Sequence, residues 1–172
     1  RGYLSYDHGI DSLYLGTSAN VGLKIDANGH ITKPLQSAFM ANFSTTLLNI
    51  SVGSNTLAID QERFDQNGDY NTSNGTFTAP VTGRYQLNAH LYFLNIDTAA
   101  SYYESLLITS NKTYGAIISP EFGADPAYFT QEICVLADMD AGDTAVVRVD
   151  QSGGSSQTDM SSGTLFSGYL VA

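Results

Sequence analysis

The sequence predicts an all-β protein, and three observations carry this prediction. Charged residues make up only 14% of the 172 residues, Gly, Ser, Thr and Asn are abundant, and no segment sustains a period of 3.6 residues. Turn residues separate short apolar runs about every 8–12 residues, which is the spacing of sandwiches and jelly rolls. Such a composition favours strands joined by turns over long helices.

The amino-terminal segment, residues 1–36, is predicted to form a β-meander followed by a linker. Strands are expected at residues 2–6, 12–17 and 21–25, and an Asn-Gly pair then predicts a tight turn because it tolerates positive φ. About thirty residues cannot bury enough apolar surface for independent stability. We therefore expect this meander to be stabilised by other copies of the chain or by sequence upstream of Arg1.

Residues 37–172 are predicted to form one all-β domain. Pro34 ends the preceding strand pairing because it has no backbone N–H. The clearest strand spans residues 84–95, where apolar and polar side chains alternate at the period of two that one buried face requires. The other expected strands are residues 37–44, 47–52, 57–64, 76–79, 101–109, 114–119, 128–137, 144–149 and 163–171.

Charge and residue pattern exclude several classes of function. The net charge is −10, so the surface repels phosphate groups and nucleic-acid binding is not expected. No run approaches the roughly 18 apolar residues of a membrane span, so membrane insertion is not expected. No Gly-x-Ser-x-Gly motif occurs, and His8, His30 and His90 lack metal-ligand spacing. We predict a protein that is not an enzyme.

The single cysteine, Cys134, excludes a disulfide within the chain. It lies in the apolar run Ile-Cys-Val-Leu at residues 133–136. A free cysteine in such a run commonly behaves as a small core residue. We therefore expect Cys134 to be buried.

Three spaced motifs identify a family resemblance. Residues 64–71 are followed by Gly-x-Phe-x-x-Pro-x-x-Gly-x-Tyr at residues 75–85, then by Ala-Gly-Asp-Thr at 141–144 and Phe-Ser-Gly-Tyr-Leu at 166–170. This order resembles the globular head of complement component one, subunit q. The resemblance covers residues 37–172 and implies a two-sheet jelly roll of about ten strands that assembles as a homotrimer, similar to the tumour-necrosis-factor superfamily.

The motif residues also have physical roles in such a fold. Pro80 and Gly83 are expected to fix the corner that leads into the strand at 84–95. Gly168, inside the last strand, is expected to allow an approach that a Cβ atom would prevent.

A second resemblance concerns the meander. Residues 6–13, Tyr-Asp-His-Gly-Ile-Asp-Ser-Leu, and residues 23–31, Leu-Lys-Ile-Asp-Ala-Asn-Gly-His-Ile, resemble a meander of bacteriophage tail-fibre and structural proteins. Joined to a trimeric head, it implies a fibre shaft that ends in a knob. The expected location is the tail fibre of a virion, outside the cell.

The resemblance to the complement head also implies a cation site. Heads of this family can hold calcium near the apex of the trimer, and Glu121 and Asp125 lie in an acidic loop that a threefold axis could bring together. Hard carboxylate oxygens suit this hard cation. Calcium is the one cofactor that we consider, and a merely solvated loop is the alternative.

The sequence is rich in tyrosine, with eleven tyrosines and no tryptophan. Tyr103, Tyr114 and Tyr128 fall near predicted strand ends and loops. A tyrosine ring can be buried while its hydroxyl stays polar, which suits both subunit interfaces and carbohydrate contacts. We assign these three as receptor-binding residues, with packing in the core or interface as the alternative.

The sequence therefore predicts the receptor-binding tip of a trimeric bacteriophage tail fibre. Its partners would be two further copies of the chain and a glycan or protein on the host cell surface. One alternative is a knob that only caps and trimerises the fibre, and another is the head of a secreted bacterial adhesin. A terminal position favours recognition over capping, because the exposed end meets the host first.

Overall fold

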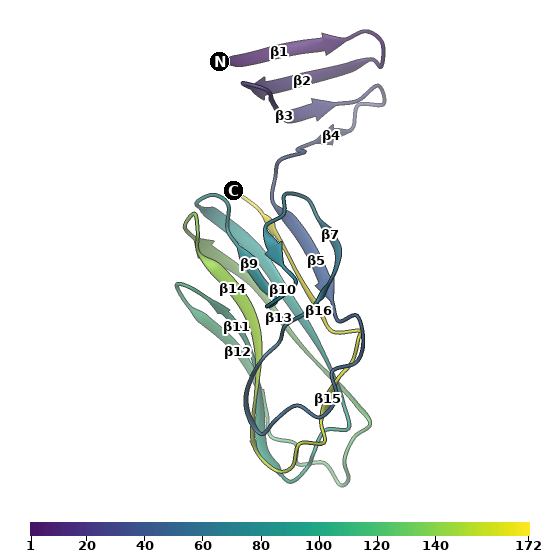
Figure 1. The fold of residues 1–172 in the computed structure, drawn as a ribbon, viewed down its shortest axis with the longest axis vertical. Helices are drawn as coiled ribbons and strands as arrows, with labels where there is room; N and C mark the ends of the chain where they lie inside the picture. The colour runs from purple at the N-terminus through teal and green to yellow at the C-terminus, as the bar shows by residue number, and fades with distance from the viewer.

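The computed structural model describes residues 1–172, and every regular element in it is a β-strand (Figure 1). Sixteen strands form a small amino-terminal sheet and two larger sheets that face each other in a head. No helix that could cross a membrane is present. The all-β prediction is confirmed.

The amino-terminal sheet is an antiparallel meander in the order β1-β2-β3-β4. Its strands are β1 (Gly2–Asp7), β2 (Ser12–Thr17), β3 (Asn20–Ile25) and β4 (Ile31–Thr32). The turn between β3 and β4 is closed by Asp26, whose Oδ1 accepts hydrogen bonds from the backbone N–H groups of Asn28 and His30, both at 2.9 Å. Gly29 has a φ of 82°, as the expected Asn-Gly turn requires.

The first head sheet has the order β13-β10-β16-β5-β7, with β15 also paired to β10, and we call it the β10 sheet. Its strands are β5 (Ala38–Asn42), β7 (Gln61–Asp65), β10 (Gly83–Leu94), β13 (Tyr128–Met139), β15 (Asp159–Met160) and β16 (Leu165–Leu170).

The second head sheet has the order β12-β11-β14-β9-β8, with β6 also paired to β14, and we call it the β14 sheet. Its strands are β6 (Gly53–Thr56), β8 (Tyr70–Asn71), β9 (Thr76–Thr78), β11 (Ala100–Thr109), β12 (Thr113–Ile118) and β14 (Thr144–Gly153).

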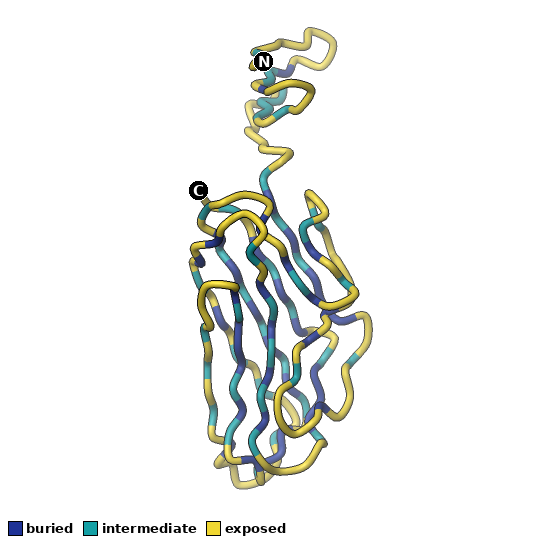
Figure 2. Tube along the Cα trace, turned by 60° about the vertical axis from the view of Figure 1, so that its left-hand side comes forward, coloured by how far each residue is buried: buried dark blue, intermediate teal, exposed yellow.

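The hydrophobic core lies between these two sheets, where Figure 2 shows the buried residues. Phe39 is at its centre: its ring stacks on Phe77 with centroids 4.7 Å apart and meets the edge of Phe166 at 5.0 Å. Aromatic pairs of this kind stabilise a core beyond their area burial. The core therefore joins β5 and β16 of one sheet to β9 of the other.

Two predicted strands differ from the structure. Residues 57–64 do not form one strand, because the chain crosses between the sheets there: β6 pairs with β14 and β7 pairs with β5. Residues 47–52 form a loop whose only ladder contact is a bridge between Leu47 and Met160. Asn49 has a φ of 55°, which interrupts an extended strand.

Cys134 is exposed, so its predicted burial is wrong. Successive residues of β13 point to opposite faces, and Ile133 takes the core position. Cys134 therefore points to the face of the β10 sheet that is turned away from the core.

The close approach expected at Gly168 is present. A Cβ atom there would lie 2.5 Å from Leu87 Cδ2 and 2.9 Å from Phe39 Cε1. We expect Gly168→Ala to lower the free energy of unfolding by about 1–3 kcal/mol, because the surrounding core must shift. Gly123→Ala is the control, since no atom lies within 4 Å of its Cβ position. Equal melting temperatures for the two variants would contradict this account.

Candidate functional site

The end of the head away from the meander is formed by residues 95–99, 119–127 and 154–158, which we call the distal loops (Figure 1). They follow β10, β12 and β14, respectively. Loops positioned by a rigid scaffold commonly carry binding functions. The distal loops are therefore the first candidate surface.

Asp97 fixes two of these loops to each other. Its buried carboxylate accepts hydrogen bonds from the Ala99 N–H at 2.8 Å, the Ser155 N–H at 2.5 Å and the Ser155 hydroxyl at 2.8 Å. These bonds, led by that from Ala99, lower the pKa of Asp97 below its ordinary value. The ionised carboxylate thus joins residues 95–99 to residues 154–158.

Asp125 makes the second connection. Its Oδ1 accepts hydrogen bonds from the Thr98 hydroxyl at 2.5 Å and the Thr98 N–H at 2.9 Å, and its Oδ2 accepts one from Gln157 Nε2 at 2.8 Å. The bonds from Thr98 and Gln157 lower the pKa of Asp125. All three distal loops are therefore held by two aspartates.

The structure contains no group of three or more His, Cys, Asp or Glu side chains placed to hold a metal ion. Both oxygens of Asp125 already accept hydrogen bonds within the chain. Glu121 lies in the same loop, 119–127. A calcium ion shared by Glu121 and Asp125 of several copies stays a prediction.

The three tyrosines assigned to receptor contact have different surroundings. Tyr103 is 0% exposed, and its hydroxyl bonds to Thr158 Oγ1 at 2.7 Å and accepts the Asp97 N–H at 3.1 Å. Its assignment is corrected: Tyr103 is a core residue, because β11 turns its ring inward. Tyr114 is half-buried against the core. Tyr128 is 70% exposed beside the distal loops.

A second candidate surface is the outward face of the β10 sheet, which no other element of the chain covers. β10 pairs with β13 on one side and with β16 on the other, and residues that lie opposite one another in these ladders share a face. Most are uncharged, and Leu136, Tyr128 and Tyr169 are exposed. The face comprises Arg84, Gln86, Asn88, His90, Tyr92, Leu94, Tyr128, Thr130, Glu132, Cys134, Leu136, Asp138, Leu165, Ser167 and Tyr169.

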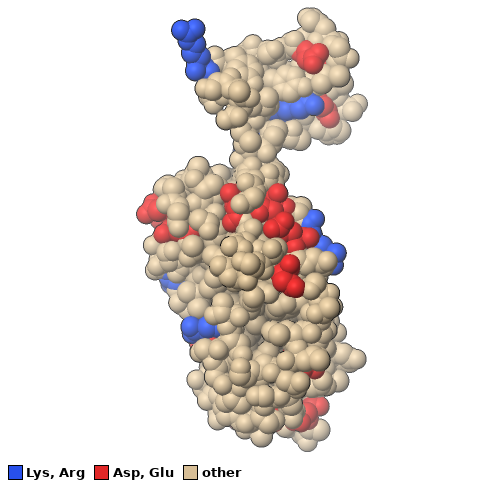
Figure 3. All heavy atoms as spheres, viewed as in Figure 1, with Lys and Arg blue, Asp and Glu red and all other residues tan.

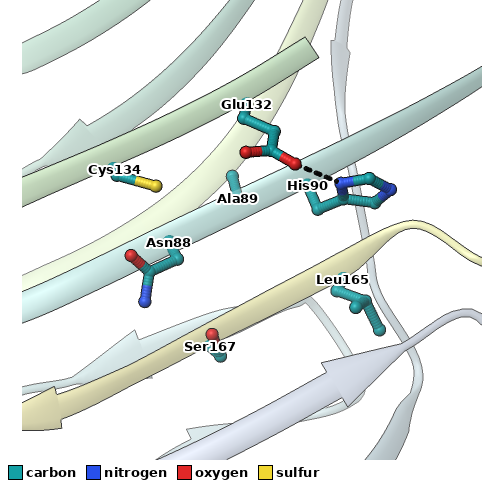
Figure 4. A pocket seen from close by; sticks show the side chains of 7 residues that line it. All are labelled: Asn88, Ala89, His90, Glu132, Cys134, Leu165 and Ser167. Carbon is teal, nitrogen blue, oxygen red and sulfur yellow. Dashed lines mark hydrogen bonds and ion pairs between the residues drawn. The ribbon is translucent and has the colours of Figure 1, made fainter. Parts of the chain in front are cut away.

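Near its centre is an open hollow of about 200 Å³, shown in Figure 4. His90 and Glu132 lie at one end, with His90 Nδ1 3.1 Å from Glu132 Oε1. Asn88, Cys134 and Ser167 supply further polar groups from three adjacent strands. A hollow lined mostly by small uncharged polar groups could receive a side chain from a neighbouring protein surface.

Acidic side chains in the view of Figure 3 gather at the end of the head that adjoins the meander. Two of the aspartates in turns there are structural. Asp65 accepts hydrogen bonds from three successive backbone N–H groups, at residues 68–70. Asp143 Oδ2 accepts the Asp140 N–H and Asn111 Nδ2, both at 2.8 Å. These carboxylates close turns, so the acidity of this end alone indicates no ligand.

A family model for the C1q domain matches residues 38–171. The model begins at the start of β5, so the meander lies outside it. No curated protein matches the sequence.

Solved structures with the same fold include the globular domain of a zebrafish complement 1qA protein, with a TM-score of 0.57 at 16% identity, covering 79% of this chain and 98% of that one. Murine APRIL at pH 8.5 has a TM-score of 0.57 at 12% identity, covering 79% and 99%. Eiger TNF from S. frugiperda has a TM-score of 0.58 at 14% identity, covering 80% and 92%. The predicted two-sheet jelly roll is confirmed.

The distal loops provide a test of the Asp97 connection. We expect Asp97→Asn to lower the free energy of unfolding at pH 7 by about 1–3 kcal/mol, because an amide replaces a carboxylate that accepts three hydrogen bonds. Glu121→Gln, in the exposed part of a distal loop, is the control and should leave stability unchanged.

The loss of stability caused by Asp97→Asn should depend on pH in a defined direction. The pKa of Asp97 is lower in the folded protein than in the unfolded chain. Its contribution to the free energy of unfolding is therefore complete at a pH above the unfolded-state pKa of about 4, and it is lost as the pH falls through the folded-state pKa. The difference between the wild type and Asp97→Asn should therefore shrink in acid. A constant difference in chemical unfolding between pH 7 and pH 3 would refute the role of the charge.

Proposed function

Because the chain belongs to the C1q domain family, we propose that its head assembles as a homotrimer and acts as a recognition domain at the tip of a fibre. Domains of this family are binding or structural domains, and they self-associate as trimers. The observation that carries the proposal for this chain is the uncovered outward face of the β10 sheet.

The composition of that face favours contact with other copies of the chain, and we assign this contact to the part of the face from Arg84 to Tyr92, which leaves Tyr128 free at its distal end. Leu136 and Tyr169 flank Gln86 in the ladder, one on each side, and both are exposed. Arg84 pairs with Asp138 at 3.9 Å, and His90 Nδ1 lies 3.1 Å from Glu132 Oε1, which is an ion pair only when His90 is protonated. Exposed apolar side chains among mostly uncharged polar groups suit contact between copies of a protein.

We place receptor contact at the distal loops, for which the position of the meander is the main argument. The meander lies at the opposite end of the head, so a shaft that continues from it leaves the distal loops as the free end (Figure 1). Phe122 and Tyr128 are exposed aromatic residues in and beside loop 119–127. Aromatic rings with nearby amides and hydroxyls suit a glycan or a protein surface.

The bacteriophage assignment rests on the meander motifs at residues 6–13 and 23–31. In this proposal the chain is the end of a tail fibre, and the head attaches the virion to a host cell-surface glycan or protein. Three rigidly linked heads would raise the avidity of weak single sites.

The trimer can be tested with one charged substitution. Leu136 is exposed in a single copy, so Leu136→Glu should leave the fold intact. In a trimer it would bury an unpaired charge in each interface, and we expect mostly monomer at micromolar concentration in sedimentation. Leu48→Glu, at an exposed leucine in loop 43–52, is the control and should remain trimeric. A trimeric Leu136→Glu protein would rule out this face as the interface.

Receptor contact can be tested separately. We expect Tyr128→Ala to reduce adsorption of the protein to host cells by at least about tenfold, since an exposed aromatic anchor commonly contributes more than about 1.4 kcal/mol. The control is Val81→Ala, at an exposed residue at the opposite end of the head. Unchanged adsorption by a Tyr128→Ala trimer would place the contact elsewhere or favour the capping function.

A further inference from the structure

One face of the meander carries mostly apolar side chains, with Thr17 as a polar residue at its edge. Residues opposite one another in an antiparallel ladder share a face, and Leu15 is opposite Leu4 on β1 and Leu23 on β3. The same pairing continues along the sheet to β4. The apolar face of the meander consists of Leu4, Tyr6, Leu13, Leu15, Leu23, Ile25 and Ile31.

The opposite face of the meander is polar and has its own packing. The Tyr3 ring lies over Gly16, so closely that a Cβ at Gly16 would clash with the ring. Lys24 Nζ lies 5.6 Å from the centre of the Tyr14 ring. Ser5 is exposed on the same face. The Tyr3 and Tyr14 rings on this face are therefore partly covered within the meander, whereas Leu4 and Leu15 on the other face are exposed.

The apolar face has no partner within the chain. The meander is a single layer, and no second sheet lies against it (Figures 1 and 2). Leu4 is 70% exposed, Leu15 54% and Ile31 63%. A small sheet needs packing on its hydrophobic face to be stable in water. The cover for these residues must come from outside residues 1–172.

The apolar face of the meander continues into the outward face of the β10 sheet. Ile31, at the end of the meander, lines a hollow of about 340 Å³ together with Ala38 and Tyr169, and the other lining residues are polar: Lys33, Gln36, Ser37 and Gln66. Ala38 and Tyr169 are paired in the ladder of β5 and β16. The two uncovered surfaces thus meet at the linker and are open on the same side of the molecule.

Hydrogen bonds hold the linker in this position. Gln66 Nε2 donates to the Lys33 carbonyl at 2.9 Å, and Asn67 Nδ2 donates to the Leu35 carbonyl at 3.0 Å. Gln36 Nε2 also donates to the Leu170 carbonyl. These contacts fix the end of the meander to the head. The apolar face of the meander and the outward face of the β10 sheet therefore stay on the same side of the molecule.

We propose that the apolar face of the meander packs against the same face of two other copies of the chain, on the axis of the head trimer. This inference rests on the proposed trimer. A second copy is the favoured occupant because the face continues the proposed head interface. The trimer would also hold three identical, uncharged faces at high effective concentration. Shaft and head would then share one continuous interface, mostly apolar in the meander and mixed in the head.

Cysteine cross-linking of the full chain tests this arrangement. In a Cys134→Ser background, Leu4→Cys and Leu15→Cys place thiols on the apolar face, and Ser5→Cys places one on the polar face of the same sheet. After treatment with a short bismaleimide, we expect covalent dimers from at least one leucine position, at a yield at least tenfold above that of Ser5→Cys.

Sedimentation of the same samples separates this inference from the proposed function. Trimers that cross-link at Leu4→Cys or Leu15→Cys, and not at Ser5→Cys, support the inference. Trimers that cross-link at none of these positions overturn it and leave the head trimer standing. A chain that is monomeric overturns both. Flotation of the wild-type chain with phosphatidylcholine vesicles would instead assign the apolar face to a lipid surface, which also overturns the inference.

Discussion

The head depends on the alternation of side chains along β10. Tyr85, Leu87, Leu91 and Phe93 point into the core and are fully buried. The pairing of β10 with β13 on one side and β16 on the other imposes the same alternation on those strands. A shift of one residue would exchange the core with the outward face. The same constraint therefore sets both the core and the surface that we assign to self-association.

The alternation also explains which parts of the fold could be predicted. The strand expected at residues 84–95 differs from β10 by one residue at each end, because its two faces differ clearly in polarity. The run at 133–136 was misinterpreted because Ile133 faces the core while Leu136 lies on the outward face. A strand that is apolar on both faces is expected where both sides are covered in an assembly. No pattern marked the crossing between β6 and β7.

The site was less predictable than the fold. Asp97 and Ser155 are 58 residues apart in the chain, and nothing near either residue indicates that they meet. The composition suggested receptor contact for Tyr103, yet its ring belongs to the core because β11 turns it inward. The motif at residues 75–85 was a better guide to the fold, because its glycines lie where the backbone is closely packed. A Cβ atom at Gly75 would clash with the backbone of Leu57, and a Cβ atom at Gly83 would clash with the backbone of Ala172. Motifs that report close backbone contacts identified the fold, whereas contacts between distant loops left no local signal.

The anchored linker has a mechanical consequence. A force that pulls the distal loops away from the shaft enters the head at the start of β5. This strand is paired along its length with β16 on one side and with β7 on the other. β5 runs down the head at an angle to its long axis (Figure 1), and the ladder hydrogen bonds are perpendicular to the strands, so much of the pull loads these bonds in shear. The amide contacts of Gln66 and Asn67 bear part of the load before β5 does. The join between shaft and head is therefore built to resist tension.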